Sequence, residues 1–185
     1  MISSACRQPG TGRRNGTGRR TEGQGILASI GHSDATYDHV IEAWERGYTH
    51  VTHLYSGMST IRRINAYRHL GVIESAYLID GMTVEIIADG KHLPPELLRF
   101  IVKMKPIEDI CLVTDSMRGA GMDDGEHVLL GSLAHGQDCI IDDGVAVLPD
   151  RSAFAGSVCT ARPVCTHHVP TGRGEAGGCG AYDDI

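Results

Sequence analysis

The sequence predicts an α/β fold, because short buried strands alternate with amphipathic helices along its middle part. Strand-like runs lie near residues 26–30, 48–55, 84–88 and 110–114, with helical patterns between them. The run at 84–88, VEIIA, is nearly all apolar, which is typical of a strand buried on both faces of a parallel sheet. Strands that alternate with helices are joined by right-handed crossovers into parallel sheets. Over residues 126–155 only short β runs and turn residues remain, which predicts a small antiparallel β meander.

The composition limits the classes of partner. The chain has 185 residues, 41% of them hydrophobic, which is enough for one packed core. Its formal net charge of -6 argues against nucleic acid or an anionic membrane as the main partner, and favours a small molecule. The sequence has no apolar run of roughly 20 residues and no signal-peptide pattern, so we expect no membrane partner and a cytoplasmic location.

The two ends differ from the middle in composition. Residues 1–24 hold five arginines among glycines and polar residues, without helical or strand periodicity. We expect this segment and residues 162–185 to be disordered, on either side of one folded domain at 25–161. Three other interpretations of the N-terminal segment stay open. It could be an arginine-glycine arm that touches RNA, an organelle-targeting arm, or an artefact of how the start of the reading frame was assigned.

The first helix is predicted directly after the strand at 26–30. Ser33 and Asp34 follow that strand, and either side chain can cap a helix N-terminus. Gly47 ends the helical pattern. The buried face is marked by apolar residues at the spacing i, i+3, i+4 and i+7, namely Tyr37, Val40, Ile41 and Trp44.

The later elements continue the alternation. Residues 56–71 predict a long loop rich in arginine, and residues 72–78 predict a short helix. Another helix is expected from Pro94 to Lys105, because proline is favoured in a first helical turn. Cys111 lies in the apolar run that follows, so a buried free thiol is the expected state.

Polar residues stand at or just after the ends of successive strands. They are His32, His53, the pair Asp89 and His92, and Asp115. The carboxyl ends of parallel strands meet at one edge of a sheet or barrel, so these side chains are candidates for one site. Two imidazoles and a carboxylate suit metal-assisted hydrolysis, in which the carboxylate moves the proton.

Simpler roles stay open for each of these residues. A histidine at a strand end can be a polar residue satisfied by a neighbouring loop. Asp115 can cap the turn that follows it, and Asp89 can begin a tight Asp-Gly turn.

Five motifs in register resemble a known family. The chain is similar to the N-acetylglucosamine-6-phosphate deacetylase family of the amidohydrolase superfamily over about residues 25–161. The motifs that carry this resemblance are GHSDA at 31–35, THVTHLYSGM at 49–58, EIIADGKH at 85–92, LVTDSM at 112–117 and FAGS at 154–157.

The resemblance implies a fold, a reaction and a cofactor. It implies about strands five to eight of a (β/α)8 TIM-type barrel, a hydrolase that removes acetate from N-acetylglucosamine 6-phosphate, and one divalent metal ion, zinc or iron. By analogy, His32 and His53 would be metal ligands, and Asp115 the general base and then acid. The family is commonly dimeric, so a homodimer is expected for the intact family member.

The resemblance also implies a set of substrate contacts. His92 would help to polarise the acetamide carbonyl, and a guanidinium would bind the phosphate, for which Arg68 is the first choice. Arg62, Arg63 and a merely solvated basic loop stay open as alternatives. The other substrate contacts implied by the resemblance are Ser56 and Gly57, where the family usually has Asn-Ala, together with Asp89, Phe154, Ala155 and Gly156.

The chain departs from the family pattern at its start. Family members place a metal-binding glutamate and the first strands before the GHSDA motif, whereas here Glu22 has no matching context. We therefore expect the third protein ligand to be missing, about half of a barrel of roughly 250 residues to be present, and metal binding by the purified chain to be weak. Two rival interpretations stay open: another amidohydrolase, and a non-catalytic remnant.

Overall fold

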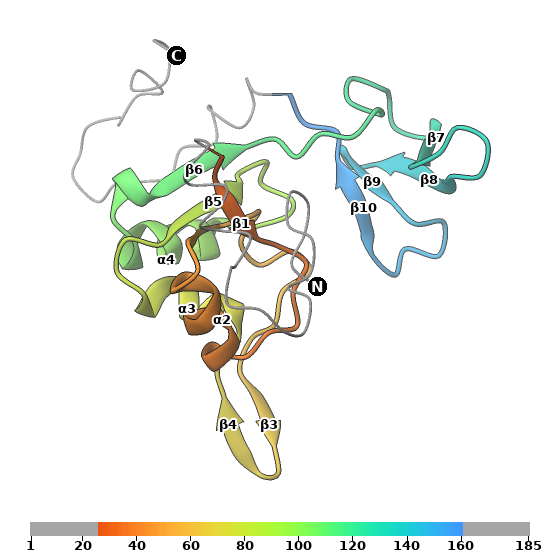
Figure 1. Ribbon diagram of the computed structural model, residues 1–185. Helices are drawn as coiled ribbons and strands as arrows, with labels where there is room; N and C mark the ends of the chain where they lie inside the picture. The colour runs from red at the N-terminus through yellow and green to blue at the C-terminus, as the bar shows by residue number, and fades with distance from the viewer. Residues whose placement is uncertain (1–25, 161–185) are drawn as a thin grey trace. The chain divides into compact units, whose positions relative to one another are not determined.

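The computed structural model of the chain describes residues 26–160 (Figure 1). The predictions made for residues 1–24 and 162–185 lie outside the described residues. The described residues form two compact units. One unit holds residues 26–86 and 104–111, the other holds 87–103 and 112–160, and each is described by itself below.

A four-stranded sheet confirms the predicted α/β class. Its strands are β1 (Ala28–Ile30), β2 (Tyr48–Val51), β5 (Thr83–Ile87) and β6 (Ile110–Val113), in the spatial order β1-β2-β5-β6. β1 pairs with β2 in parallel, and so does β2 with β5. Neighbouring strands of this sheet therefore follow one another along the chain.

The predicted helices are present. They are α2 (Tyr37–Trp44), α3 (Val72–Leu78) and α4 (Pro95–Met104), and a short 3-10 helix, η1 (Ile107–Asp109), follows.

The start of α2 corrects the predicted cap. The N-cap is Thr36, whose backbone N–H donates to Nδ1 of His39 at 3.3 Å. Ser33 is instead used in the preceding turn, where its hydroxyl oxygen accepts the N–H of Ala35 at 3.2 Å. On the predicted buried face of α2, Val40 is buried, and Tyr37, Ile41 and Trp44 are half-buried. Ala43 is buried as well.

The two faces of the sheet differ in polarity. Side chains alternate across a strand, and one face of β5 carries Val84 and Ile86, both 0% exposed. On the other face Thr83 and Glu85 lie beside His50 of β2. The prediction that VEIIA is buried on both faces was therefore wrong at Glu85, which is half-buried.

Cys111 is exposed, so the predicted buried thiol was wrong. β6 stands at the end of the strand order, and alternation turns Ile110 inward and Cys111 outward.

The segment 56–71 contains a β hairpin, which corrects the predicted loop. The hairpin consists of β3 (Arg62–Ile64) and β4 (Tyr67–His69), and Figure 1 shows it as an extended arm. Asn65 and Ala66 at its turn have φ angles of 50° and 70°, as a two-residue turn with two left-handed residues requires. Sequence reasoning missed it because these strands carry no alternation of apolar and polar residues and their turn lacks the usual glycine.

The predicted meander is confirmed in the second unit. Its strands are β7 (His127–Leu130), β8 (Gln137–Asp142), β9 (Val145–Val147) and β10 (Phe154–Ser157), which pair antiparallel in the order β10-β9-β8-β7. Its small core consists of Val128, Cys139, Ile141, Ala146 and Val158.

None of the helices in residues 26–160 is long and apolar enough to cross a membrane.

Candidate functional site

Two histidines at the ends of neighbouring parallel strands lie together. His32 follows β1 and His53 follows β2, and their ring centroids are 4.7 Å apart in an edge-to-face arrangement. Both residues have positive φ, 45° for His32 and 27° for His53. Such backbone conformations are costly for residues other than glycine and persist where the surrounding structure holds them. The predicted proximity of these two histidines is therefore confirmed.

The imidazole of His53 has an unusual buried atom. His53 is only 5% exposed, and its Nδ1 is buried without a hydrogen-bond partner among the described residues. An unpaired buried nitrogen costs free energy that a bound ligand would recover. A divalent metal ion suits this atom, because the neutral imidazole nitrogen is a common metal ligand.

The two imidazoles fit as part of a metal site and not as a complete one. Among residues 26–160 no group of three or more histidine, cysteine, aspartate or glutamate side chains could hold a metal ion. His32 and His53 are therefore two candidate ligands, and further ligands have to come from beyond this group.

Gly57 lies against His32. A Cβ atom added to Gly57 would be 2.7 Å from Nδ1 of His32, and its φ is +61°. The neighbouring Ser56 donates its backbone N–H to the carbonyl oxygen of His53 at 3.0 Å. The structure thus brings Ser56 and Gly57 to the histidine pair, while their predicted contact with a sugar stays a prediction.

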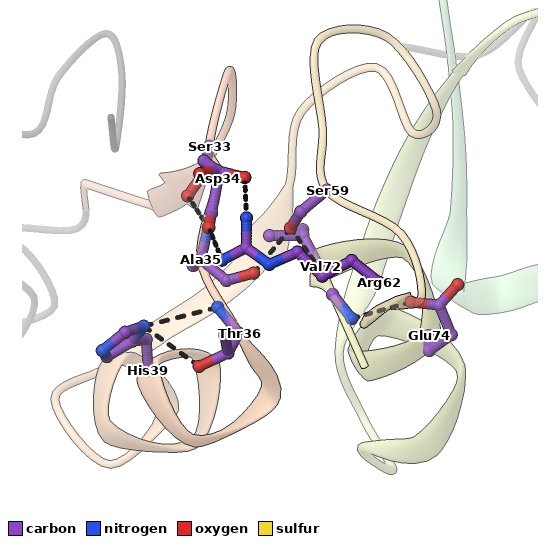
Figure 2. A network of polar contacts seen from close by, with 10 residues as sticks. Ser33, Asp34, Ala35, Thr36, His39, Ser59, Arg62, Val72 and Glu74 are labelled. Atoms are coloured by element: carbon purple, nitrogen blue, oxygen red, sulfur yellow. Dashed lines mark hydrogen bonds and ion pairs between the residues drawn. The ribbon is translucent and has the colours of Figure 1, made fainter. Parts of the chain in front are cut away.

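Ser59 ties the loops that follow the two histidines (Figure 2). Its backbone N–H donates to the carbonyl oxygen of Ser33 at 2.9 Å, and its hydroxyl donates to the carbonyl oxygen of Ala35. The same hydroxyl oxygen accepts the N–H of Val72, at the start of α3, at 3.0 Å. One serine therefore joins the loop after His32, the loop after His53 and a helix.

Arg62 adds an ion pair to the hydrogen bonds made by Ser59. Its guanidinium binds the side chain of Asp34 and donates to the Asp34 carbonyl oxygen at 3.0 Å, as Figure 2 shows. Hydrogen bonding to Arg62 lowers the pKa of Asp34 below its ordinary value. Arg62, one of the candidate phosphate ligands, is therefore engaged by a carboxylate.

The two other candidate arginines lie opposite each other. Arg63 of β3 pairs with Arg68 of β4 across the hairpin, and both are exposed. Like charges directly opposite in a hairpin repel each other. An anion near this pair would relieve that repulsion, but the assignment of Arg68 to a phosphate stays a prediction.

In the second unit Asp89 holds its own loop and His92. Oδ1 of Asp89 accepts the backbone N–H groups of Lys91 and His92, both at 2.9 Å. Oδ2 accepts a hydrogen bond from Nδ1 of His92 at 2.7 Å. Burial acts to raise the pKa of Asp89, but the hydrogen bonds from His92 and Lys91 outweigh it and keep that pKa below its ordinary value. Both oxygens of the Asp89 carboxylate therefore accept hydrogen bonds within its own loop. The contact of Asp89 with a substrate stays a prediction.

His92 also meets Phe154, from the FAGS motif. The two ring centroids are 5.0 Å apart, with the rings tilted by 52°. Because Nδ1 is directed to Asp89, any contact of His92 with a substrate would have to use Nε2. Two motifs that are 62 positions apart in the sequence, at His92 and Phe154, are thus neighbours in the fold.

Asp115 stands on a loop that is bound to β10. Its backbone has a φ of 47°, and its side chain is exposed. The next residue, Ser116, forms a β bridge with Ser157, and the N–H of Met117 donates to the Ser157 carbonyl oxygen at 2.8 Å. The loop of Asp115 is therefore adjacent to the segment that contains Ala155 and Gly156.

Asp89 gives a stability prediction with a defined pH dependence. The folded pKa of Asp89 is depressed, so its contribution is present above the unfolded pKa of about 3.9 and is lost as pH falls through the folded value. We expect Asp89→Asn to lower the free energy of unfolding at pH 7 by about 1–3 kcal/mol, and the difference from the original chain to shrink between pH 5 and pH 3. Urea unfolding at these pH values measures both effects. Asp143→Asn, at an exposed carboxylate that pairs with Lys91, is the control, and equal losses in the two variants would contradict the role of Asp89.

Sequence reasoning missed the polar cluster next to His53. Nε2 of His50 and Oε1 of Glu85 are hydrogen-bonded at 3.1 Å, and Oε2 of Glu85 accepts the backbone N–H of His53 at 3.2 Å. The one signal in the sequence was the charged residue in the apolar run VEIIA.

The chain resembles sugar-phosphate deacetylases in sequence. It is 34% identical over 136 residues to the N-acetylglucosamine-6-phosphate deacetylase of Lysinibacillus sphaericus, which covers 74% of this chain and 33% of the relative. It is 35% identical over 128 residues to the N-acetylglucosamine-6-phosphate deacetylase of Bacillus subtilis, and this match covers 68% of this chain and 31% of the relative. An N-acetylgalactosamine-6-phosphate deacetylase of Shewanella is 30% identical over 140 residues, covering 76% of this chain and 33% of the relative.

Solved structures give the same resemblance. A variant of the N-acetyl-D-glucosamine-6-phosphate deacetylase of Mycobacterium smegmatis, in complex with N-acetyl-D-glucosamine-6-phosphate, matches with a TM-score of 0.70 and 32% identity, over 80% of this chain and 37% of that one. The N-acetylglucosamine-6-phosphate deacetylase of Thermotoga maritima matches with a TM-score of 0.66 and 28% identity, over 79% and 42%. No protein-family model matches the chain. The family resemblance predicted from the five motifs is confirmed, and the chain spans about a third of the length of the curated relatives it matches.

Proposed function

We propose that this chain, which is similar to N-acetylglucosamine-6-phosphate deacetylases over about three quarters of its length, carries part of a metal-dependent site that hydrolyses the acetamide of N-acetylglucosamine 6-phosphate. The products are glucosamine 6-phosphate and acetate, as in amino-sugar catabolism. The observation that carries the proposal is the pair His32 and His53, with ring centroids 4.7 Å apart and a buried Nδ1 on His53 without a hydrogen-bond partner among the described residues.

The order of the strands supports a partial (β/α)8 barrel, with β1, β2, β5 and β6 as its fifth to eighth strands. A doubly wound sheet reverses its strand order at a switch point. In this sheet the order β1-β2-β5-β6 follows the chain without reversal, as neighbouring strands of a barrel do. His32 and His53 then stand where the side chains of a barrel site converge.

His32 and His53 would hold one divalent ion, zinc or iron, together with further ligands. Such an ion would supply Lewis-acid polarisation of the acetamide carbonyl and would make the attacking water more acidic. Asp115 would accept the proton of that water and then donate it to the leaving amine, the two roles of a carboxylate general base and acid. His92, held by Asp89 through Nδ1, would present Nε2 to the carbonyl oxygen.

The phosphate of the substrate requires a cation. A guanidinium can engage two phosphate oxygens at once. Arg68 is the first choice, and the facing Arg63 would add to the positive potential. Arg62 is the weaker candidate, since Asp34 already occupies its guanidinium.

The test is acetate release by the purified chain with added zinc or ferrous iron. We expect slow, metal-dependent release that requires the 6-phosphate of the sugar and is abolished by Asp115→Asn. Asp138→Asn, at an exposed aspartate of β8, is the matched control and should retain the rate. Equal hydrolysis of N-acetylglucosamine without phosphate would favour another amidohydrolase. No binding of the sugar phosphate, measured by calorimetry, would favour a non-catalytic remnant.

The sugar itself has a second candidate. Relatives named N-acetylgalactosamine-6-phosphate deacetylases match the chain at 30% and 31% identity. The two sugars differ only in the configuration at one carbon, so the same assay with both 6-phosphates decides between them. A higher kcat/KM for N-acetylgalactosamine 6-phosphate would make it the substrate in place of N-acetylglucosamine 6-phosphate.

Two further expectations accompany the proposal. Two imidazoles form an incomplete ligand set, so we expect the purified chain to bind zinc weakly at best, and tight stoichiometric zinc together with measurable acetate release would contradict this. The homodimer and the cytoplasmic location stay predictions.

A further inference from the structure

Glu85 is a carboxylate in a strand whose neighbours are apolar. Val84 and Ile86 on either side of it are 0% exposed, while Glu85 lies half-buried on the opposite face of the sheet. A charged group in such a place costs free energy unless hydrogen bonds satisfy it. Both of its oxygens have partners: Oε1 is 3.1 Å from Nε2 of His50, and Oε2 accepts the backbone N–H of His53 at 3.2 Å.

Glu85 holds the turn that carries His53 at two successive positions. Its side chain accepts the N–H of His53, and its backbone carbonyl oxygen accepts the N–H of Leu54 at 2.8 Å. His53 has a φ of 27°, a conformation that persists only where its surroundings fix it. Since the chain bends at His53, a change in its backbone dihedral angles would redirect the imidazole.

His50 in turn holds Glu85. His50 is 4% exposed, with Nδ1 2.6 Å from the hydroxyl oxygen of Thr83 and Nε2 at Glu85. His50 and Thr83 face each other in the parallel pairing of β2 and β5, so the sheet itself fixes this imidazole. The hydrogen bonds therefore form a relay from Thr83 through His50 and Glu85 to the backbone of His53.

We propose that Glu85 is a positioning residue that fixes the direction of the His53 imidazole, and that His50 orients the Glu85 carboxylate for this role. The link to metal binding rests on the function proposed above, whereas the hold on the His53 backbone does not. A purely structural role, in which the pair of His50 and Glu85 only joins two strands, is the alternative.

The matched control is Glu74. Its carboxylate lies in the same unit and also accepts one backbone N–H, from Gly71 at 2.8 Å, and one side-chain hydrogen bond, from Thr60 at 2.6 Å. It makes no described contact with His53. Glu74→Ala and Glu85→Ala thus remove the same kind of interaction from different places, and Glu85→Gln keeps an oxygen that can accept the N–H of His53.

The first measurement is amide hydrogen exchange at His53 in the metal-free chain. We expect Glu85→Ala to speed exchange at His53 by at least about tenfold relative to global unfolding, which reports local opening. Glu74→Ala should leave the exchange unchanged on the same scale, and Glu85→Gln should lie between the two. Equal protection of His53 in the Glu85→Ala and Glu74→Ala variants would overturn the proposal.

The second measurement is zinc affinity by calorimetry. Loss of a group that orients a metal ligand typically weakens binding by about 10–100-fold, so we expect that loss for Glu85→Ala and unchanged affinity for Glu74→Ala. If Glu85→Ala binds zinc as the original chain does, the positioning role is wrong. If the original chain binds no zinc that depends on His53, the proposed function fails, while the exchange rates still decide the role of Glu85.

Discussion

Replacing Gly71 with alanine is expected to destabilise the first unit, because the added side chain would meet backbone atoms. A Cβ atom on Gly71 would lie 2.4 Å from both the carbonyl carbon and the carbonyl oxygen of Ser59, and 2.7 Å from the nitrogen of Thr60. These atoms belong to the backbone and cannot rotate away. Overpacking of a buried position costs about 1–3 kcal/mol, occasionally more, and we expect the upper end. The φ of Gly71 is -105°, so the penalty is steric and does not come from the backbone conformation.

The same substitution is expected to disturb the histidine pair. Ser59 binds Ser33 and Ala35 on the loop after His32, and the N–H of Ile73 donates to the Ser59 carbonyl oxygen at 3.2 Å. A shift of Ser59 would therefore loosen the loops that hold both histidines. Urea unfolding measures the stability, and histidine side-chain NMR shifts report on His32 and His53.

Gly144→Ala is the control for this prediction. Gly144 has a φ of +72°, but a Cβ there would meet nothing within 4 Å. It therefore adds only the left-handed penalty of about 1–2 kcal/mol. If Gly71→Ala cost no more than Gly144→Ala, the close approach of Ser59 to Gly71 would be wrong.

The helices and the meander could be predicted because single patterns specify them. The proline at the start of the pattern from Pro94 to Lys105 indicated a helix, and α4 spans Pro95–Met104. Turn residues such as Asp143 and Gly144 indicated the meander, and both have positive φ between β8 and β9. In such elements local propensity and the tertiary fold agree, so the sequence pattern is sufficient.

The β3–β4 hairpin and the hydrogen bonds of Ser59 could not be predicted in the same way. The β3 and β4 strands contain arginine, tyrosine and histidine without alternation, and the Asn65-Ala66 turn lacks the glycine that usually marks such a turn. The hydrogen bonds of Ser59 reach residues 24 and 13 positions away, Ala35 and Val72. Such long-range contacts leave no periodic trace in a sequence.

The part of the candidate site that lies at strand ends could be predicted from the sequence. His32 and His53 follow neighbouring parallel strands, so sheet geometry alone predicted that they meet. The role of Asp89 was less predictable, because whether a carboxylate faces a substrate or its own loop depends on the path of Gly90 to His92. Gly90 has a φ of 75°, which turns the following N–H groups back onto Asp89.

Lys105→Met is expected to destabilise the first unit, although methionine suits a buried position better than lysine. Lys105 is only 5% exposed, and its Nζ donates to the carbonyl oxygen of Ala76 at 2.9 Å. Ala76 lies in the last turn of α3, where carbonyl groups lack partners within the helix. Methionine keeps the apolar stem but leaves this carbonyl unpaired, which costs about 1–3 kcal/mol.

The pH dependence identifies the amine as the cause. Burial lowers the pKa of Lys105, although Asp109 and Asp80 act in the opposite direction. The unfolded chain then binds more protons than the folded one as pH approaches the unfolded pKa of about 10.4, so stability contributed by this group rises with pH in that range. The difference in free energy of unfolding between the original chain and Lys105→Met, measured in urea at pH 7 and pH 10, should therefore grow with pH.

Lys103→Met separates the amine from the general loss of a lysine. Lys103 is exposed in the last turn of α4, where substitutions usually change stability by less than about 0.5 kcal/mol. A loss confined to Lys105→Met would assign the effect to the hydrogen bond with Ala76. If instead Lys105→Met were more stable than the original chain at pH 7, the cost of burying the ammonium would exceed the value of that hydrogen bond, because removal of the charge would then outweigh the carbonyl left without a donor.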